Sequence, residues 1–123
     1  MPGPVVLHVA SERHPLVKTG GLADVVGALP AAQRRAGLDA RVLLPGYPRV
    51  LAAATHVTEI ARCPTLPGGA SGRLLELTLH DAEVPTYALE AHALYDRPGG
   101  PYVDEHGSEH GDNAERFAAL GWA

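Results

Sequence analysis

The stretch VVLHVASERHPLVKTGGLADVVGALP, residues 5–30, joins a short apolar run to a loop with two adjacent glycines and then to a helix-like pattern. Residues 5–10 are apolar on both alternating faces, which is typical of a strand buried between two helix layers. We therefore predict an interior, parallel strand. Apolar residues after the glycines recur at helical spacing and predict one stripe that packs on the sheet: Leu22, Val25, Val26 and Leu29.

The residues that follow extend this strand and helix into a larger unit. Pro30 interrupts the helical pattern, so we expect a kink or local opening before the helix resumes, and Gly37 predicts its left-handed end. Residues 40–44 form a second aliphatic strand. Residues 5–44 thus have the length of a strand–helix–strand unit with a right-handed crossover.

The second half of the chain has a less regular pattern. Residues 49–54 predict a short helix and residues 56–62 a third strand, while residues 74–79 and 84–89, separated by HDAE, predict an antiparallel hairpin. Residues 91–111 are aperiodic and rich in glycine, proline and charge, which indicates a long functional loop or a disordered one. The predicted fold class is α/β, with a mostly parallel sheet and one antiparallel hairpin.

Composition limits the possible classes of function. The 123 residues suffice for one domain, and no apolar run approaches the length of a membrane span. A single cysteine, Cys63, fits a reducing cytoplasm and predicts a small buried side chain. The net charge of -4 argues against a nucleic-acid partner. We predict a soluble cytoplasmic protein with neither nucleic acid nor membrane as partner.

The glycine loop is the strongest candidate site. A turn between a buried strand and a helix places free backbone amides at the positive end of the helix, which favours a phosphate. Gly20 and Gly21 allow a ligand to approach the backbone, and Lys18, the chain's single lysine, adds positive charge. The common phosphate-loop and dinucleotide fingerprints are both absent. These residues leave two interpretations open, a phosphate or nucleotide site and a flexible loop whose glycines make a tight turn.

A resemblance to a known family adds to this interpretation. It is carried by five motifs: HVASE at 8–12, PLVKTGGLADVVGALP at 15–30, RVLLPGYP at 41–48, LYDRPGGPY at 94–102 and DNAERFAALGWA at 112–123. Together they resemble the N-terminal part of bacterial glycogen synthases and plant starch synthases. The resemblance implies that residues 1–123 are part of the Rossmann-like, acceptor-side domain of a two-domain GT-B glycosyltransferase. The donor-side domain would be absent from this chain.

The resemblance also implies an activity. Enzymes of this family transfer glucose from ADP-glucose to the non-reducing end of an α-1,4-glucan such as glycogen, with retention of configuration, and no metal or cofactor is expected. The implied ADP-glucose-binding residues are Lys18, Thr19, Gly20, Gly21, Asp24 and Tyr95. No catalytic residue can be assigned, because the family's catalytic histidine and the basic and acidic groups of its second domain lie downstream.

Several of these residues have an alternative structural interpretation. Asp24 either bonds ligand or loop, or favours the helix dipole, and Tyr95 either lines the cleft or packs the loop. Glu12 either orients Lys18 or is exposed. We expect Asp96 and Arg97 to form a structural pair that braces their loop.

Further polar residues receive structural interpretations. His8 is expected to be a core histidine bonded to backbone. His106 and His110 are expected in a solvated loop rather than at a metal site. Asp112 or Asn113 can cap a last helix.

Two other classes of function compete with the enzyme hypothesis. One is a non-catalytic nucleotide-sugar or glycan-binding module or a truncated remnant, and the other, disfavoured by the missing fingerprint, is a dinucleotide-dependent dehydrogenase. The isolated chain is expected to be inactive, since half of the cleft would be missing. Its apolar faces, without later partners, are expected to promote self-association.

Overall fold

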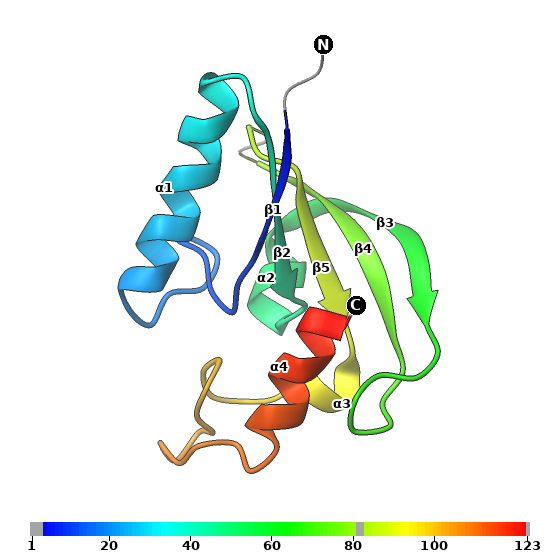
Figure 1. Cartoon of the computed structure of the whole chain (residues 1–123). Helices are drawn as coiled ribbons and strands as arrows, with labels where there is room; N and C mark the ends of the chain where they lie inside the picture. Colours follow the sequence, from blue (N-terminus) through cyan, green and yellow to red (C-terminus); the bar gives the residue numbers. More distant parts are fainter. Residues whose placement is uncertain (1–3, 81–82, 123) are drawn as a thin grey trace.

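The computed structural model describes residues 4–80 and 83–122, which form one sheet with flanking helices (Figure 1). In chain order the elements are β1 (Val5–Val9), α1 (Gly21–Arg35), β2 (Asp39–Pro45), α2 (Pro48–Ala53), β3 (Ala54–Cys63), β4 (Gly72–Leu79), β5 (Thr86–Glu90), α3 (His92–Tyr95) and α4 (Asn113–Trp122). The predicted elements are confirmed in kind and order. Within the described ranges, every helix is too short or too polar to cross a lipid bilayer.

The sheet has the strand order β1-β2-β5-β4-β3 and is mixed. Strands β1, β2 and β5 are parallel, whereas β4 runs antiparallel to both β5 and β3. The prediction of a mostly parallel sheet is therefore wrong, because β3, β4 and β5 follow one another through connections too short for a parallel crossover. The predicted hairpin is confirmed as β4 and β5, although residues 81–82 of its turn lie outside the described residues.

The first strand–helix–strand unit has the order of elements that its sequence predicts. Strand β1 pairs with β2 in parallel, with Val5 beside Asp39 and Val9 beside Leu43. Helix α1 continues through Pro30 to Arg35, and Gly37 follows with φ +95°, the left-handed conformation expected at the helix end.

Helix α1 turns a different face to the sheet from the one predicted. Of the predicted stripe only Val26 is buried, and the other members are about half exposed: Leu22 at 47%, Val25 at 54% and Leu29 at 43%. The packed face consists mainly of small residues: Ala23, Val26, Pro30 and Ala31. Gly27 of the same helix packs closely against the loop after β1, because a Cβ at this position would lie only 2.8 Å from the His14 carbonyl oxygen.

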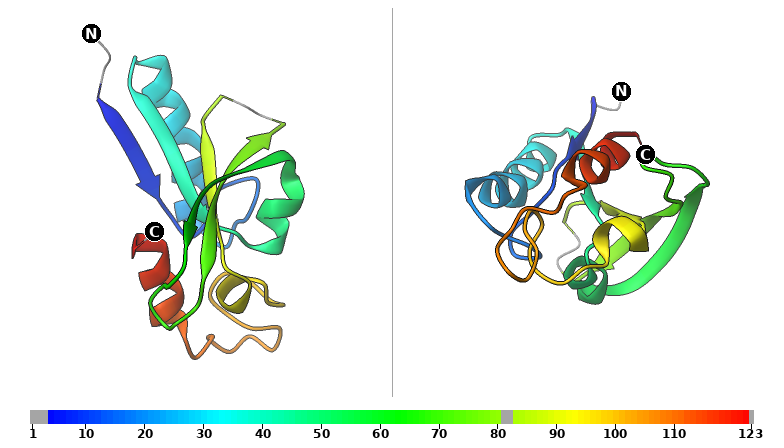
Figure 2. Two further views of the ribbon diagram at one scale, coloured as in Figure 1. Left: turned by 90° about the vertical axis from the view of Figure 1, so that its right-hand side faces the viewer. Right: turned by 90° about the horizontal axis from the view of Figure 1, so that it is seen from below.

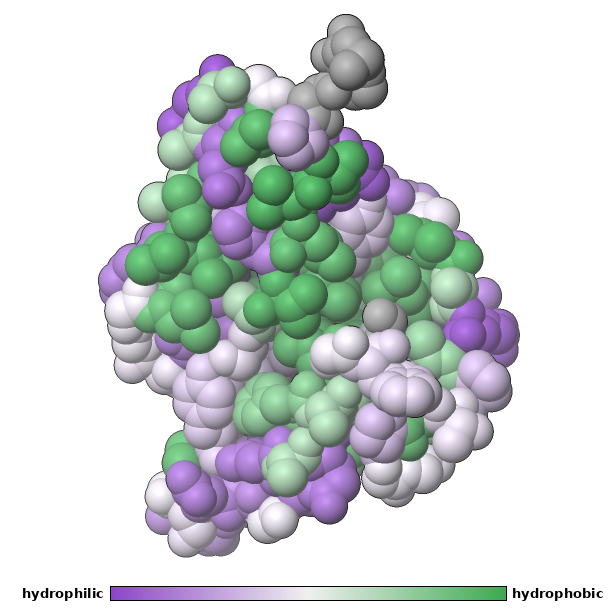
Figure 3. Space-filling view, viewed as in Figure 1, coloured by the Kyte–Doolittle hydropathy of each residue, from purple (hydrophilic) through white to green (hydrophobic). Residues whose placement is uncertain are grey.

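Strand β1 is an edge strand rather than an interior one. One of its faces is exposed, with Val5 at 69%, Leu7 at 51% and Val9 at 47%, so the expectation of burial on both faces is wrong. The other face lies against α1, where the His8 ring bonds the Gln33 side chain at 2.7 Å instead of the expected backbone partner. Figure 3 shows apolar surface over α1 and β1.

The sheet directs three loops to one end of the molecule. The parallel strands β1, β2 and β5 share a direction, so their carboxyl ends meet there, and α3 and α4 lie beside them (Figures 1 and 2). In open α/β sheets this is the end at which ligands bind. The core under it is formed by fully buried side chains of β2 and β5, among them Val42, Leu44 and Leu89.

The exposed apolar residues of α1 and β1 predict self-association of the isolated chain. Leu7→Lys and Val25→Lys place charges on this surface without disturbing buried contacts, so we expect both to shift the chain toward monomer in sedimentation velocity at micromolar concentration. Ala52→Lys, at an exposed position of α2, is the control and should associate like the original chain. A chain that is monomeric without any substitution would contradict this expectation.

Candidate functional site

A single buried carboxylate fixes the loop between β1 and α1. Glu12 is 2% exposed, and its oxygens accept hydrogen bonds from the backbone amides of Thr19 at 3.1 Å and Ala23 at 3.2 Å. The Thr19 hydroxyl donates to the same carboxylate. Both sequence interpretations of Glu12 are wrong, because it is neither exposed nor bonded to Lys18. It fills the positive N-terminus of α1 from within the protein.

The two glycines of the loop keep their amides open. No hydrogen bond from the amide of Gly20 or Gly21 occurs among the residues that the structure describes. Neither glycine has a positive φ, and a Cβ built at either would meet nothing within 4 Å. The fold therefore does not require glycine at these positions, and the space beside the open amides is free. A glycine is useful there if a ligand approaches the backbone.

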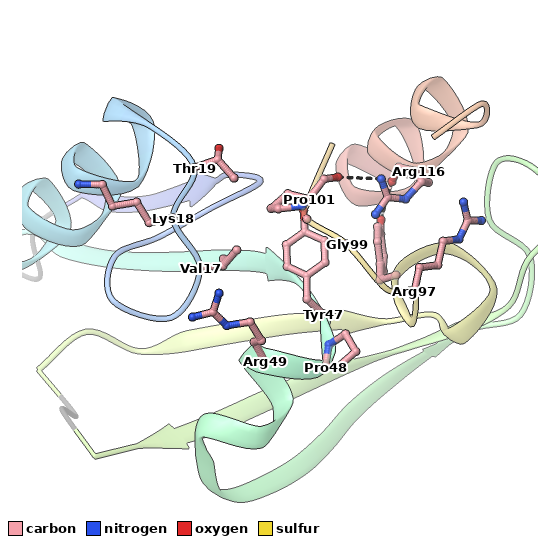
Figure 4. Close-up of a pocket in the computed structure, with 12 residues that line it drawn as sticks. Val17, Lys18, Thr19, Tyr47, Pro48, Arg49, Arg97, Gly99, Pro101 and Arg116 are labelled. Carbon is pink, nitrogen blue, oxygen red and sulfur yellow. Dashed lines mark hydrogen bonds between the residues drawn. The ribbon is translucent and has the colours of Figure 1, made fainter. Parts of the chain in front are cut away.

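Lys18 is held by Asp24 on the first turn of α1. Its Nζ lies 2.7 and 2.8 Å from the two carboxylate oxygens, and hydrogen bonding to Lys18 is the main reason that the pKa of Asp24 lies below its usual value. Both side chains are about half exposed. In Figure 4 the ammonium group of Lys18 points toward α1 and away from Tyr47. Lys18 must leave Asp24 before it can bind a ligand above the strand ends.

Tyr95 lies in the wall of a cavity but is itself buried. It is 1% exposed, and its hydroxyl donates to the Arg116 carbonyl oxygen at 2.5 Å. Its ring meets that of Tyr47 edge to face, with centroids 5.9 Å apart. Burial raises the pKa of Tyr95 to about 12. Tyr95 thus lies behind the cavity wall with almost no exposed surface, and its hydroxyl is already bonded within the protein.

The segment after α3 is ordered by ion pairs and turns. Asp96 and Arg97 do not pair with each other, because Arg97 holds Asp112 at 2.5 Å and Asp96 bonds His92 at 3.0 Å. The carboxylate of Asp112 therefore pairs with Arg97 and does not cap the last helix, α4. The predicted Asp96–Arg97 pair is therefore wrong, and Arg97 holds this segment through Asp112 instead. The alternative of a disordered segment is also wrong.

His106 and His110 of this segment make different contacts. His106 is exposed and its backbone amide bonds Asp104, while the His110 ring contacts the Gly100 carbonyl oxygen at 3.3 Å. In the described part of the chain no group of three side chains is placed to hold a metal ion. Cys63, expected to be buried, is half-buried and free.

A cavity of about 190 Å³ lies where the three loops meet. Figure 4 shows side chains from the loops after β1, β2 and β5 and from α4 around it. It is lined by Val17, Lys18, Thr19, Tyr47, Pro48, Arg49, Tyr95, Arg97, Gly99, Gly100, Pro101 and Arg116. The structure brings Lys18, Thr19 and Tyr95 together here, whereas Gly20, Gly21 and Asp24 lie outside this lining.

Sequence reasoning missed the arginines of this cavity. Arg49 follows β2, Arg97 follows β5, and Arg116 reaches the cavity from α4. The positions of Arg49 and Arg97 just after two parallel strands could have indicated them, because such strand ends converge. Nothing in the local sequence indicates that Arg116 is 1% exposed.

Comparison with known proteins identifies relatives of the whole chain. Residues 5–123 match the family described as "Starch synthase catalytic domain". Glycogen synthase from Erwinia tasmaniensis is 52% identical over 118 residues, covering 95% of this chain and 24% of that protein. Glycogen synthase from Variovorax paradoxus is 48% identical over 122 residues, covering 96% of this chain and 25% of that protein. The chain spans about a quarter of the length of these relatives.

A solved structure shows the same fold. The catalytic domain of starch synthase IV from Arabidopsis thaliana superposes with a TM-score of 0.75 at 24% sequence identity, covering 96% of this chain and 24% of that one. The mixed sheet described above therefore agrees with a starch synthase catalytic domain in architecture.

Removal of the Glu12 carboxylate should destabilise the loop and α1 together. Glu12→Ala leaves the buried amide of Ala23 and the part-buried amide and hydroxyl of Thr19 without their acceptor, which should lower the free energy of unfolding by about 2–4 kcal/mol in urea titrations. Glu12→Gln keeps one acceptor oxygen, so its free energy of unfolding should fall by less than that of Glu12→Ala. Glu109→Ala, an exposed acid, is the control and should change it by less than about 0.5 kcal/mol. Equal stability of Glu12→Ala and the original chain would contradict the role of Glu12.

The Arg97 and Asp112 pair should make stability depend on acid pH. Hydrogen bonding to Arg97 is the main cause that lowers the pKa of Asp112 in the folded chain. The pair therefore stabilises the fold above about pH 4 and loses its effect as the pH falls through the lowered pKa. Asp112→Asn should reduce stability at pH 7, with a difference from the original chain that shrinks toward pH 3 in urea titrations. A difference independent of pH would contradict this assignment.

Proposed function

Because the chain belongs to the family of starch synthase catalytic domains, we propose that it is the N-terminal portion of a glycogen synthase. The complete enzyme would transfer glucose from ADP-glucose to the non-reducing end of an α-1,4-glucan with retention of configuration. The main support is the identity of 48–52% to glycogen synthases over nearly the whole chain. The solved starch synthase IV holds ADP and acarbose, a ligand pair that fits a nucleotide donor and a glucan acceptor.

In this proposal the loop after β1 binds the diphosphate of ADP-glucose. The amides of Gly20 and Gly21 are open and unobstructed at the N-terminus of α1, where a negative charge is favoured. Lys18 lines the cavity next to Thr19. Its ammonium group supplies a cation to the diphosphate once it leaves Asp24. Thr19 serves as support, because Glu12 holds both its amide and its hydroxyl.

The same contacts would assist the reaction as well as binding. Departure of ADP leaves negative charge on the diphosphate, and fixed amide donors and a cation stabilise that charge most as the glycosidic bond breaks. Glu12 contributes by keeping the loop in one conformation, so that the donors need no rearrangement. Tyr95 supports the wall beside them from a buried position. No group in this proposal requires a metal or an organic cofactor.

The length of the chain favours a second candidate function for this polypeptide by itself. It spans 24% of the Erwinia relative, and in the proposed enzyme most residues of a complete cleft would lie outside this span. On this ground the isolated chain would bind a nucleotide sugar or a glucan without transferring glucose. Incubation with ADP-glucose and glycogen separates the candidates, since glucose transfer by the purified chain would contradict inactivity of the isolated chain.

Lys18→Ala should weaken donor binding. Loss of a charge-assisted contact to phosphate should raise the dissociation constant for ADP-glucose about tenfold in calorimetric titrations. Arg35→Ala removes an exposed basic residue at the far end of α1 and is the control. Equal affinity of the Lys18→Ala and original chains would contradict the proposed donor site.

Gly20→Ala separates ligand binding from folding. The added methyl group meets no protein atom within 4 Å and the backbone φ is -166°, so the free energy of unfolding should change by less than about 1 kcal/mol. The methyl group would occupy the space beside the open amides, and ADP-glucose affinity should fall at least fivefold. Gly111→Ala, equally unobstructed but outside the loop between β1 and α1, should retain both properties. Unchanged affinity in Gly20→Ala would contradict close approach of the ligand.

A further inference from the structure

The cavity beside Tyr95 has an unbalanced charge. Its lining contains four basic side chains and no acidic one: Lys18, Arg49, Arg97 and Arg116. Two of the four are neutralised by carboxylates outside the lining, because Lys18 pairs with Asp24 and Arg97 with Asp112. Arg49 and Arg116 therefore determine the net charge of the cavity.

Arg116 is a buried cation that pairs with no carboxylate of the residues that the structure describes. It is 1% exposed, and its Nε donates to the Leu94 carbonyl oxygen at 2.6 Å. Its Nη1 donates to the Pro101 carbonyl oxygen at 2.7 Å, the dashed line in Figure 4, and to Asn113 Oδ1 at 2.8 Å. Burial is the main cause that lowers the pKa of Arg116. A buried guanidinium that meets only neutral acceptors is costly unless an anion completes its environment.

One nitrogen of this guanidinium remains available to a ligand. Within residues 4–80 and 83–122 no hydrogen bond from Nη2 of Arg116 is formed, although Nε and Nη1 are both bonded. The ring faces of Tyr95 and Phe117 lie 5.8 and 5.5 Å from its central carbon and hold the group in place. The remaining donor is thus prepositioned in a side chain that lines the cavity.

Arg49 supplies a second available guanidinium. It follows Pro48 at the start of α2, is exposed, and forms no hydrogen bond or ion pair with any described residue. In Figure 4 it extends from α2 toward the loop that carries Val17. The other exposed arginines, Arg35 and Arg62, pair with Glu83 and Glu59, whereas Arg49 pairs with no acidic side chain of the described residues.

We propose that this cavity binds a phosphate-type oxyanion, with Arg116 and Arg49 as its cationic contacts. The volume of about 190 Å³ lies below the range of pockets for drug-sized ligands and suits a small charged group. Planar guanidinium groups match the oxygens of phosphate and favour it over a monovalent ion. The oxyanion is either the diphosphate of the proposed sugar nucleotide or the phosphate of a separate ester. This site adds residues to the proposed function, which assigns only the loop after β1.

Inorganic pyrophosphate is the probe that tests the site. Calorimetric titration of the chain at low ionic strength should give saturable binding that weakens as salt is added. Arg49→Gln should weaken pyrophosphate binding at least fivefold, whereas Arg62→Gln, an exposed arginine on β3, should stay within twofold of the original chain. Absence of saturable binding, or equal affinity in Arg49→Gln and the original chain, would overturn the proposal.

A second measurement addresses Arg116 without substituting a core residue. In nuclear magnetic resonance spectra the guanidinium signals of Arg116 should shift on addition of pyrophosphate, and those of Arg13, also buried but outside the cavity lining, should not. An unmoved Arg116 signal would also overturn the proposal.

Competition with ADP-glucose identifies the source of the oxyanion. Loss of pyrophosphate binding at saturating ADP-glucose assigns the site to the donor diphosphate, and retained binding assigns it to a separate phosphate ester. Both results support an oxyanion site. The proposed donor site fails on a different measurement, namely unchanged ADP-glucose affinity in Lys18→Ala. The two hypotheses can therefore be contradicted separately.

Discussion

The structure of the candidate site depends on the buried carboxylate of Glu12. By accepting bonds from Thr19 and Ala23 it joins the end of the loop after β1 to the first turn of α1. It occupies part of the positive helix end, yet leaves the amides of Gly20 and Gly21 open. The protein thus supplies one anion to fix the loop and exposes the remaining donors for another. A loop held in this way can bind phosphate without first paying for its own ordering.

In the proposed enzyme, the chain would carry one wall of a cleft. Its loops converge at the carboxyl ends of three parallel strands, and the relatives that contain this part are about four times longer. The exposed apolar residues of β1 and α1 fit the same picture, because an edge strand with an uncovered face is stabilised when further chain packs against it. Donor contacts on this wall and catalytic groups from elsewhere would then complete the proposed reaction.

Much of this fold could be predicted from local patterns, because the strands and helices are encoded by apolar periodicity and by residues such as Gly37. The errors concern tertiary choices. Val25 and Leu29 satisfy the helical stripe as well as Val26 does, and only packing against the sheet selects the face with Ala23. The edge position of β1 follows from strand order, which periodicity does not contain. The bonds of Glu12 and the burial of Arg116 likewise arise from residues brought together only by folding.

Backbone amide shifts on addition of ADP-glucose provide the most direct test of the central claim, that Glu12 fixes a loop whose remaining amides bind a diphosphate. In nuclear magnetic resonance spectra of the isotopically labelled chain, the backbone amide signals of Gly20 and Gly21 should shift the most. The amides of Thr19 and Ala23, bonded to Glu12, should stay protected from hydrogen exchange with and without ligand. Saturating ADP-glucose that leaves the two glycine signals unmoved, or rapid exchange at Ala23 in the free chain, would contradict the account.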